Sequence, residues 1–210
     1  ACVKDFYESR LIEAQAGSWP RVVPAITGPG ANAVAARGGS LFGLFVAQIG
    51  LPAHQGLLLT AWPDARALAR GASLAIDGVS GVRTVSSERV AATVRPTEAS
   101  PRTEPGVYAH RWFEIADEDW PEFLELSQAA WPEFEKTFGV EVQGLFRSLD
   151  TEAPDARVLL ITRYPSLAVW ERSRRPAGSA QEASFARFRR RARLTRSTVV
   201  VTTRLAGVPD

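Results

Sequence analysis

Hydrophobic positions in the second half of the chain alternate between the periods of strands and helices. Residues 106–115 are aromatic and β-branched, which predicts a strand. Residues 117–121 combine three acidic residues with an early proline, which is typical of a helix start. Apolar residues at helical spacing then run as far as Phe134, and Gly139 predicts the end of this helix.

Two further strands, a second helix and a last strand complete the pattern. Residues 140–149 and 157–164 predict strands joined by a polar turn. Pro165 opens a second helix that we expect to continue to about Arg193. Residues 196–205 are rich in Val and Thr and predict the final strand. The predicted order is therefore β-α-β-β-α-β.

The first half of the chain repeats this pattern, which indicates a tandem duplication. At an offset of 101 residues the matched positions include Tyr7 and Tyr108, Arg10 and Arg111, Glu13 and Glu114, Trp19 and Trp120, and the tripeptides that begin at Gly43 and Gly144. Insertions raise the offset to 102 in the third strand and to 109 in the last strand, where Val90 matches Val199. We predict repeats at residues 1–97 and 106–210, joined by a linker at 98–105.

The first helix of the first repeat departs from its counterpart. Pro24 and the stretch Gly28-Pro29-Gly30 stand where the second repeat keeps a helical stripe. Proline inside a helix removes a backbone hydrogen bond and clashes with the preceding turn. We therefore expect this helix to be shortened or bent.

A βαββαβ unit forms a four-stranded antiparallel sheet with both helices on one face. Its other face would carry some of the apolar side chains of residues 42–46 and 57–59, which are costly to leave in water. Two such sheets stacked face to face cover each other. The predicted fold class is α+β: two tandem ferredoxin-like βαββαβ repeats packed sheet to sheet as an intramolecular dimeric α/β barrel around a cavity.

Composition supports an ordinary globular protein. The chain has 210 residues, with 45% hydrophobic residues, 23% charged residues and a net charge of +2. No apolar run approaches the about 20 residues of a membrane helix, and the first residues lack the pattern of a signal peptide. A single cysteine, Cys2, cannot form an internal disulfide. These features predict a cytoplasmic location.

Three stretches resemble the NIPSNAP family of the dimeric α/β-barrel superfamily. The similar positions are residues 7–10 and 108–111 in the first strands, residues 162–172 at the third strand and second helix, and residues 185–188 late in that helix. Ala109 stands where the family has Glu, and Thr162 where it has Trp. The resemblance implies a superfamily of cofactor-free monooxygenases, cyclases, isomerases and haem enzymes, in which most NIPSNAP members have no assigned reaction.

Arg10, Arg111 and Glu8 are candidate catalytic residues. Charged side chains are costly to bury under helices, so we expect all three to face the cavity between the sheets. There an arginine would bind an anion or an enolate, because its planar fork matches carboxylate geometry. The alternative is an internal salt bridge with Glu8 that joins the two sheets.

The two histidines, His110 and His54, have different predicted surroundings. His110 lies on the opposite strand face to Arg111, so we expect it in the core beneath the helices. If the faces are reversed, His110 is the best general base in the chain. His54 lies in a turn and is predicted to be solvated.

Trp62 and Tyr164 end equivalent strands and are candidates for stacking on a flat substrate, although ordinary packing explains them equally well. Trp112, Tyr108 and Phe146 complete the predicted substrate-binding set.

No set of His, Cys, Asp or Glu residues has metal-ligand spacing, and no glycine-rich loop follows a strand. Haem is a disfavoured alternative. The resemblance implies that a haem protein of this superfamily would present an axial histidine from a helix, and neither histidine here lies on a predicted helix. The basic run Arg187–Arg196 closes a helix, where cations are favourable, and is predicted to be a solvated helix end and not a nucleic-acid or membrane contact.

The leading functional prediction is an enzyme that binds a small hydrophobic, aromatic or polyketide-like molecule in the barrel without a cofactor. Oxygenation, cyclisation and isomerisation all fit, with Arg10 or Arg111 stabilising an oxyanion and His110, Glu8 or Tyr164 moving a proton. The alternative is a non-catalytic ligand-binding or interaction protein. We expect a monomer with an internal pseudo-dimer, or a homodimer, with no nucleic-acid or membrane partner.

Overall fold

The computed structural model describes residues 5–71, 73–175 and 179–208. The first repeat contains β1 (Phe6–Ala14), α1 (Trp19–Ala25), the π-helical turn η1 (Ile26–Gly30), α2 (Ala31–Ala36), β2 (Ser40–Ile49), β3 (Gln55–Trp62), α3 (Ala65–Gly71) and β4 (Val82–Arg95). The second repeat contains β5 (Val107–Ala116), the 3-10 turn η2 (Asp117–Asp119), α4 (Trp120–Phe138), β6 (Glu141–Ser148), β7 (Asp155–Tyr164), α5 (Leu167–Arg172), α6 (Ser179–Arg193) and β8 (Thr195–Leu205).

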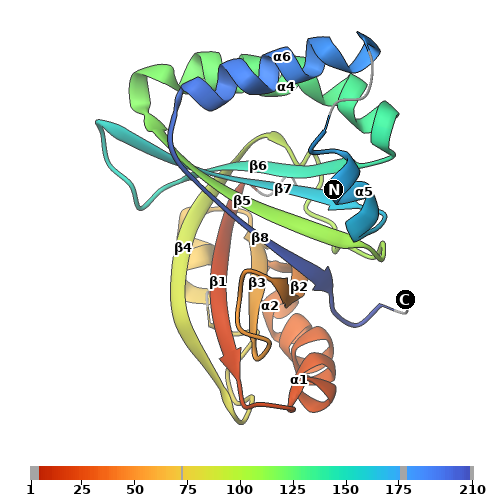
Figure 1. Cartoon of the computed structure of the whole chain (residues 1–210). Coiled ribbons are helices and arrows are strands. Elements are labelled where there is room, and N and C mark those ends of the chain that lie inside the picture. Colours follow the sequence, from red (N-terminus) through yellow and green to blue (C-terminus); the bar gives the residue numbers. More distant parts are fainter. Residues whose placement is uncertain (1–4, 72, 176–178, 209–210) are drawn as a thin grey trace.

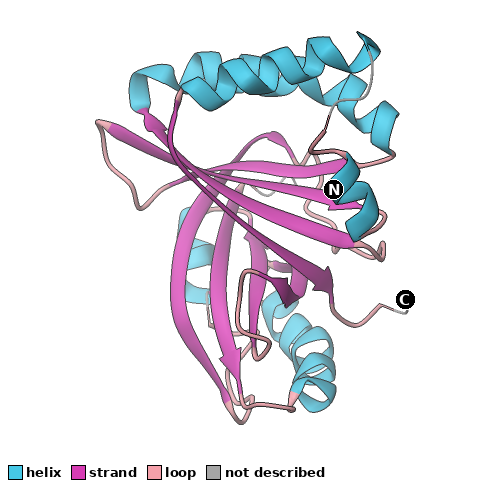
Figure 2. Cartoon of the chain, viewed as in Figure 1, coloured by secondary structure: helices cyan, strands magenta, loops and turns pink. Residues whose placement is uncertain are grey.

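The strands form a closed antiparallel barrel in the order β1-β3-β2-β8-β5-β7-β6-β4. The edge strands of one repeat pair with those of the other, β2 with β8 and β4 with β6. The barrel therefore has no free strand edge. Figure 1 shows α4 and α6 lying across the outer face of the second sheet, and Figure 2 shows helices outside both sheets. The predicted fold class is confirmed.

The pairing registers relate the two repeats residue by residue. Tyr7 lies opposite Ala61 and Val90, whereas Tyr108 lies opposite Arg163 and Thr203. The third strands therefore match as the sequence predicts. The match of Val90 with Val199 is wrong, because the structural equivalent of Val90 in the last strand is Thr203.

The space between the two sheets is filled by aromatic and aliphatic side chains. Tyr7 contacts Phe146 with ring centroids 4.8 Å apart, and Phe45 contacts Tyr108 at 5.0 Å. The rest of this buried cluster is Phe42, Leu59, Ala61, Val90, Leu159, Ile161 and Leu205. The volume that we expected to be a cavity is thus a packed core that joins the two repeats.

Both helix predictions for the second repeat can be compared with the structure. Helix α4 has a proline in its first turn, Pro121, and ends at Gly139, whose φ of 61° is left-handed, as the sequence predicts. The second helix was expected to be continuous from Pro165 to Arg193. It is instead two helices, α5 ending at Arg172 and α6 beginning at Ser179.

In the first repeat, the predicted irregularity takes the form of a π-helical turn. Pro24 lies inside α1 and Pro29 inside η1, and α2 continues afterwards. A π-turn accommodates backbone groups that lose their α-helical partners. The first helix of this repeat, formed by α1, η1 and α2, is therefore interrupted and not shortened. The second helix of the repeat, α3, is short.

The linker packs across one end of the barrel. The Arg102 guanidinium lies 4.5 Å from the Phe42 ring centroid, and its Nη1 donates a hydrogen bond to Gln143 Oε1 at 2.9 Å. The Tyr108 hydroxyl donates to the carbonyl of Glu104 at 2.7 Å.

None of the helices in the described part of the chain combines the length and the hydropathy of a membrane-spanning helix.

We predict that Gly71→Ala destabilises the protein by about 1–3 kcal/mol, because its new Cβ would lie 2.0 Å from the fully buried ring of Trp62. Gly28→Ala is the control: a Cβ there has no neighbour within 4 Å, so the free energy of unfolding should change little. Urea unfolding of both variants provides the measurement. Equal effects would show that the packing against Trp62 is not as described.

Candidate functional site

The strand faces are reversed from the prediction. Arg10 pairs with Leu58 and Arg111 pairs with Leu160, and both leucines belong to the cores between sheet and helices. Arg10, Arg111 and Glu8 therefore lie on the helix side, and His110 lies inside the barrel. The prediction failed because it treated burial of charge under helices as prohibitive, whereas Arg10 has a partner there and Arg111 borders a pocket.

Arg10 and Glu8 form a buried ion pair on the outer face of the first sheet. Arg10 Nη2 lies 2.8 Å from Glu8 Oε1 and 3.0 Å from Oε2, and Arg10 Nη1 donates to Thr84 Oγ1 at 2.6 Å. Burial raises the pKa of Glu8, and the positive charge of Arg10 opposes this increase. The salt-bridge alternative describes these two residues, although the pair lies within one strand and does not join the sheets.

Arg111 has no such partner. The position equivalent to Glu8 is Ala109, and no Asp or Glu in the described ranges forms an ion pair with Arg111. The Tyr164 side chain lies close to its guanidinium. Burial lowers the pKa of Arg111, and the nearby positive charge of Arg174 lowers it further.

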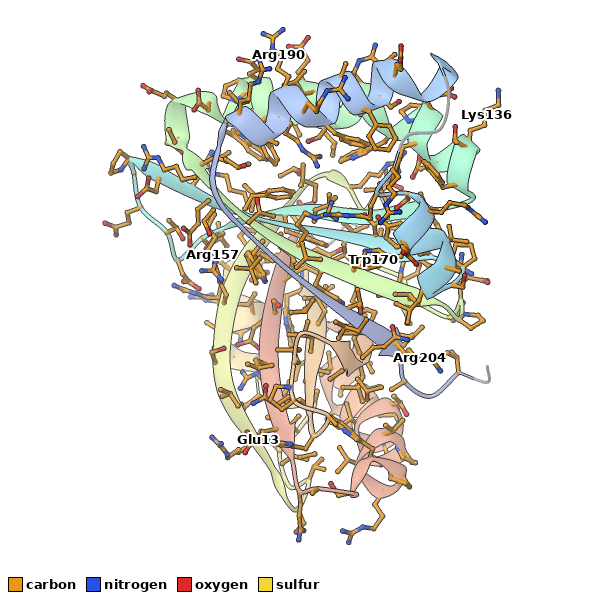
Figure 3. All side chains as sticks on the ribbon, in the orientation of Figure 1. Glu13, Lys136, Arg157, Trp170, Arg190 and Arg204 are labelled. Carbon is orange, nitrogen blue, oxygen red and sulfur yellow. The ribbon has the colours of Figure 1, made fainter. Side chains whose placement is uncertain are left out.

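Arg111 and Tyr164 line a pocket of about 290 Å³ between the second sheet and α4, α5 and α6. Its apolar wall consists of Phe113, Trp131, Phe134, Val142, Leu160, Phe185, Phe188 and Ala192. Its polar lining consists of Arg111, Thr162, Tyr164, Ser173, Arg174, Arg189, Arg191, Thr195 and Thr198. An aromatic wall combined with convergent polar groups is a common form of a small-molecule site. Figure 3 shows that some side chains of α4 and α6 extend toward the strands, whereas Arg190 points away from them.

Arg191 is the second buried cation of the pocket. Its guanidinium lies 5.0 Å from the ring centroids of Phe113 and Phe188 and 5.3 Å from that of Phe123. Its Nη1 donates to Ser127 Oγ at 3.1 Å. Burial, together with the like charge of Arg111, lowers the pKa of Arg191 to about 9. The side chain therefore remains charged at neutral pH.

The sequence analysis missed Arg191 because it treated residues 187–196 as one solvated run. Arg190 fits that description, since it is exposed and pairs with Glu122. Arg191 differs because it stands three residues after Phe188 and six after Phe185, which places it on the apolar stripe of α6. That spacing is the signal that could have identified it.

The electrostatic character of the pocket is strongly positive. Four arginines line it, and no Asp or Glu does so among the residues that the structure describes. Trp131 Nε1 is also buried, and no described residue forms a hydrogen bond with it. Buried cations and donors without partners are costly. An anionic oxygen of a ligand would satisfy them.

His110 and two predicted aromatic residues lie in the packed barrel core. His110 Nε2 is 3.2 Å from Thr203 Oγ1, and its Nδ1 has no hydrogen-bond partner within the described part of the chain. Burial lowers the pKa of His110 to about 3, so the ring is neutral at pH 7. Tyr108 and Phe146 are fully buried in the same core, and burial raises the pKa of Tyr108 to about 12.

The remaining predicted residues also lie away from the pocket. Trp62 is buried in the first repeat, where its Nε1 donates to Thr60 Oγ1 at 3.0 Å. Trp112 is half-buried beneath the Arg157 guanidinium, which is 4.6 Å from its ring centroid. Of the predicted site residues, only Arg111 and Tyr164 line the pocket that the described residues form, whereas Arg10 and Glu8 lie together as the ion pair of the first sheet. Cys2 lies outside the described residues.

The pocket does not offer the usual ligands of a haem iron or a metal ion. No histidine or cysteine is among its described lining residues, and the two histidines of the chain lie in the barrel core and in the turn before β3. The described residues contain no group of three or more His, Cys, Asp or Glu side chains that could hold a metal ion. The donor set therefore does not fit a haem held by an axial imidazole.

We predict that Arg10→Met lowers the free energy of unfolding by about 3–5 kcal/mol, because it leaves the Glu8 carboxylate buried without a partner. Arg111→Met should leave stability within about 1 kcal/mol of the wild type, because no carboxylate loses a partner. Denaturant unfolding at pH 7 measures both. A loss for Arg111→Met as large as that for Arg10→Met would contradict this assignment.

We also predict a pH dependence that arises from His110. Its folded-state pKa of about 3 lies below the unfolded value, so the unfolded chain binds an extra proton as the pH falls through about 6.5. This group should therefore remove about 2 kcal/mol of stability between pH 7 and pH 5. The free energy of unfolding of His110→Gln should fall less between pH 7 and pH 5 than that of the wild type. Equal losses of stability in His110→Gln and in the wild type would contradict this prediction.

No family model matches the chain, and no curated protein matches it. Several solved structures are similar to this chain in fold. A “putative monooxygenase” from Lactobacillus acidophilus NCFM is 9% identical, with a TM-score of 0.60 over 96% of this chain and 94% of that one. An anthrone oxidase-like protein is 13% identical, with a TM-score of 0.59 over 97% and 92% of the two chains.

A mutant form of chlorite dismutase from Candidatus Nitrospira defluvii is also 13% identical, with a TM-score of 0.59 over 97% of this chain and 92% of that one. At these identities the likeness shows the fold, a dimeric α/β barrel completed within one chain. The resemblance to NIPSNAP proteins stays a prediction.

Proposed function

We propose that this protein binds a small hydrophobic, aromatic or polyketide-like molecule in the pocket between the second sheet and α4, α5 and α6, and transforms it there without a metal or nucleotide cofactor. The observation that carries the proposal is the presence of Arg111 and Arg191 in an aromatic pocket without a carboxylate partner in the described chain. A cytoplasmic location and a monomeric or homodimeric state remain predictions from the sequence.

Two guanidinium groups in a low-dielectric pocket favour the ionised form of a bound acid. A positive charge within about 4–6 Å lowers the pKa of an acidic group by roughly 1–3 units. An aromatic ketone with an acidic C–H would therefore lose its proton more readily when its oxygen lies beside Arg111 or Arg191. The arginines would stabilise the resulting enolate, in the manner of an oxyanion hole.

Tyr164 is the candidate for moving the proton. Its side chain lies close to Arg111 and lines the pocket. The exposed residues Arg174 and Thr198 border the same pocket, so the proton has a route to solvent. The proposed apparatus consists of charge stabilisation, removal of water from the aromatic wall, and one hydroxyl group.

Oxygenation is the reaction that the names of the structural neighbours favour, since one is anthrone oxidase-like and another is described as a monooxygenase. For anthrone the step balances without a cofactor. The carbanion formed by loss of the C10 proton reduces O2 to a bound hydroperoxide, which loses water to give the quinone. The sum is one anthrone and one O2 to one anthraquinone and one water. Cyclisation and isomerisation would begin from the same enolate.

A second candidate function is non-catalytic ligand binding. No His, Asp or Glu lines the pocket within residues 5–71, 73–175 and 179–208, so the common general bases are missing from its described wall. A protein that only binds an anionic aromatic molecule would need the arginines and the apolar wall, but no base. Turnover distinguishes the two functions.

We predict that oxygen uptake in the presence of anthrone and a metal chelator exceeds the spontaneous rate, and that Arg191→Met reduces this excess at least tenfold. Arg190→Met is the control, because it removes the neighbouring arginine at an exposed position. An oxygen electrode gives the rate, and native mass spectrometry of the freshly purified protein reports any retained molecule. Binding without oxygen uptake would select the non-catalytic function. The absence of both would contradict the proposal.

A further inference from the structure

The two repeats provide an internal comparison of the same arginine in two surroundings. Arg10 and Arg111 occupy equivalent positions in β1 and β5, because each pairs with the equivalent leucine of the neighbouring strand, Leu58 or Leu160. Both side chains lie on the helix side of their sheets. What differs is the residue two positions earlier, which is Glu8 in the first repeat and Ala109 in the second.

In the first repeat, this position supplies a carboxylate to the arginine. Glu8 receives hydrogen bonds from both Nε and Nη2 of Arg10, at distances of 2.8–3.3 Å. Such a contact uses the planar fork of the guanidinium, which matches the two oxygens of a carboxylate. The protein itself thus shows which anion this strand position accepts.

In the second repeat, smaller side chains stand at the two equivalent positions. Ala109 ends at Cβ, and Trp62 of the first repeat is replaced by Tyr164. The Trp62 ring packs so closely on Gly71 that an added Cβ there would lie 2.0 Å away, so it fills the helix side of its own sheet. Its counterpart Tyr164 instead borders the 290 Å³ pocket together with Arg111.

We propose that the ligand of the pocket carries a carboxylate, which Arg111 binds as Arg10 binds Glu8. This inference rests on the proposed function, because it places the ligand in the same pocket. The substrate class is then an aromatic or polyketide-like carboxylic acid. Its ring system lies against the apolar wall that includes Phe134 and Phe188, and Arg191 remains available for a second oxygen, where negative charge develops.

The test compares an acid with its neutral isostere. Isothermal titration calorimetry would measure the binding of naphthalene-2-carboxylate and of naphthalene-2-carboxamide, which share size and shape and differ in charge. The wild type should bind the acid at least tenfold more tightly than the amide. Ala109→Glu places a carboxylate before Arg111, as Glu8 stands before Arg10, and should abolish the preference for the acid.

Ala109→Gln is the matched control, because it adds nearly the same volume without a charge and should retain the preference. Circular dichroism reports whether the two variants fold. If neither folds, Arg111→Met replaces them and should lose the preference for the acid. Retained preference in Ala109→Glu, or in Arg111→Met, would overturn the inference.

Equal affinity of the wild type for acid and amide would overturn the carboxylate inference alone, since binding in the pocket would remain. Absence of binding by both probes would also overturn it. In that case Arg191-dependent oxidation of anthrone, which carries no carboxylate, would leave the proposed function standing. If neither probe binds and anthrone is not oxidised in an Arg191-dependent way, the proposed function is overturned as well.

Discussion

The packing of two aromatic sheet faces against each other is the interaction on which this structure depends. Each repeat brings one half of the barrel core, and Tyr7 of the first repeat contacts Phe146 of the second at 4.8 Å. The same contact brings the edge strands of the two repeats within pairing distance, so the barrel closes. Core packing and closure of the barrel therefore depend on each other. Either repeat alone would expose an apolar sheet face and unpaired strand edges.

This filled core determines where a ligand can lie. The volume between the sheets is packed, and the candidate pocket lies on the helix side of the second sheet. The two repeats differ on this side. The first repeat fills it with Trp62 and neutralises Arg10 with Glu8. The second repeat covers its sheet with the longer helices α4 and α6 and leaves Arg111 and Arg191 without carboxylates in the described chain. The asymmetry of charge and volume is the basis of the proposed site.

The sequence was sufficient to predict the element order, the duplication and the end of α4, because these depend on local periodicity, prolines and glycines. It could not decide which face of the first strands points inward. Both faces of these strands are buried, so Tyr108 and Ala109 are equally hidden, and alternation carries no signal of direction. Arg191 could have been found from its spacing to Phe188, whereas the pocket itself depends on how far α4 and α6 stand from the sheet.

The pairing of β4 with β6 and of β2 with β8 has a consequence for synthesis on the ribosome. The first repeat leaves the exit tunnel before β6 and β8 exist, so its apolar face and two strand edges have no partner during that time. Strand β2 must then wait for β8, the last strand of the second repeat, to be translated. Closure of the barrel thus follows synthesis of both repeats, and the nascent first half is the stage at which unpaired strand edges are open to strand-to-strand aggregation.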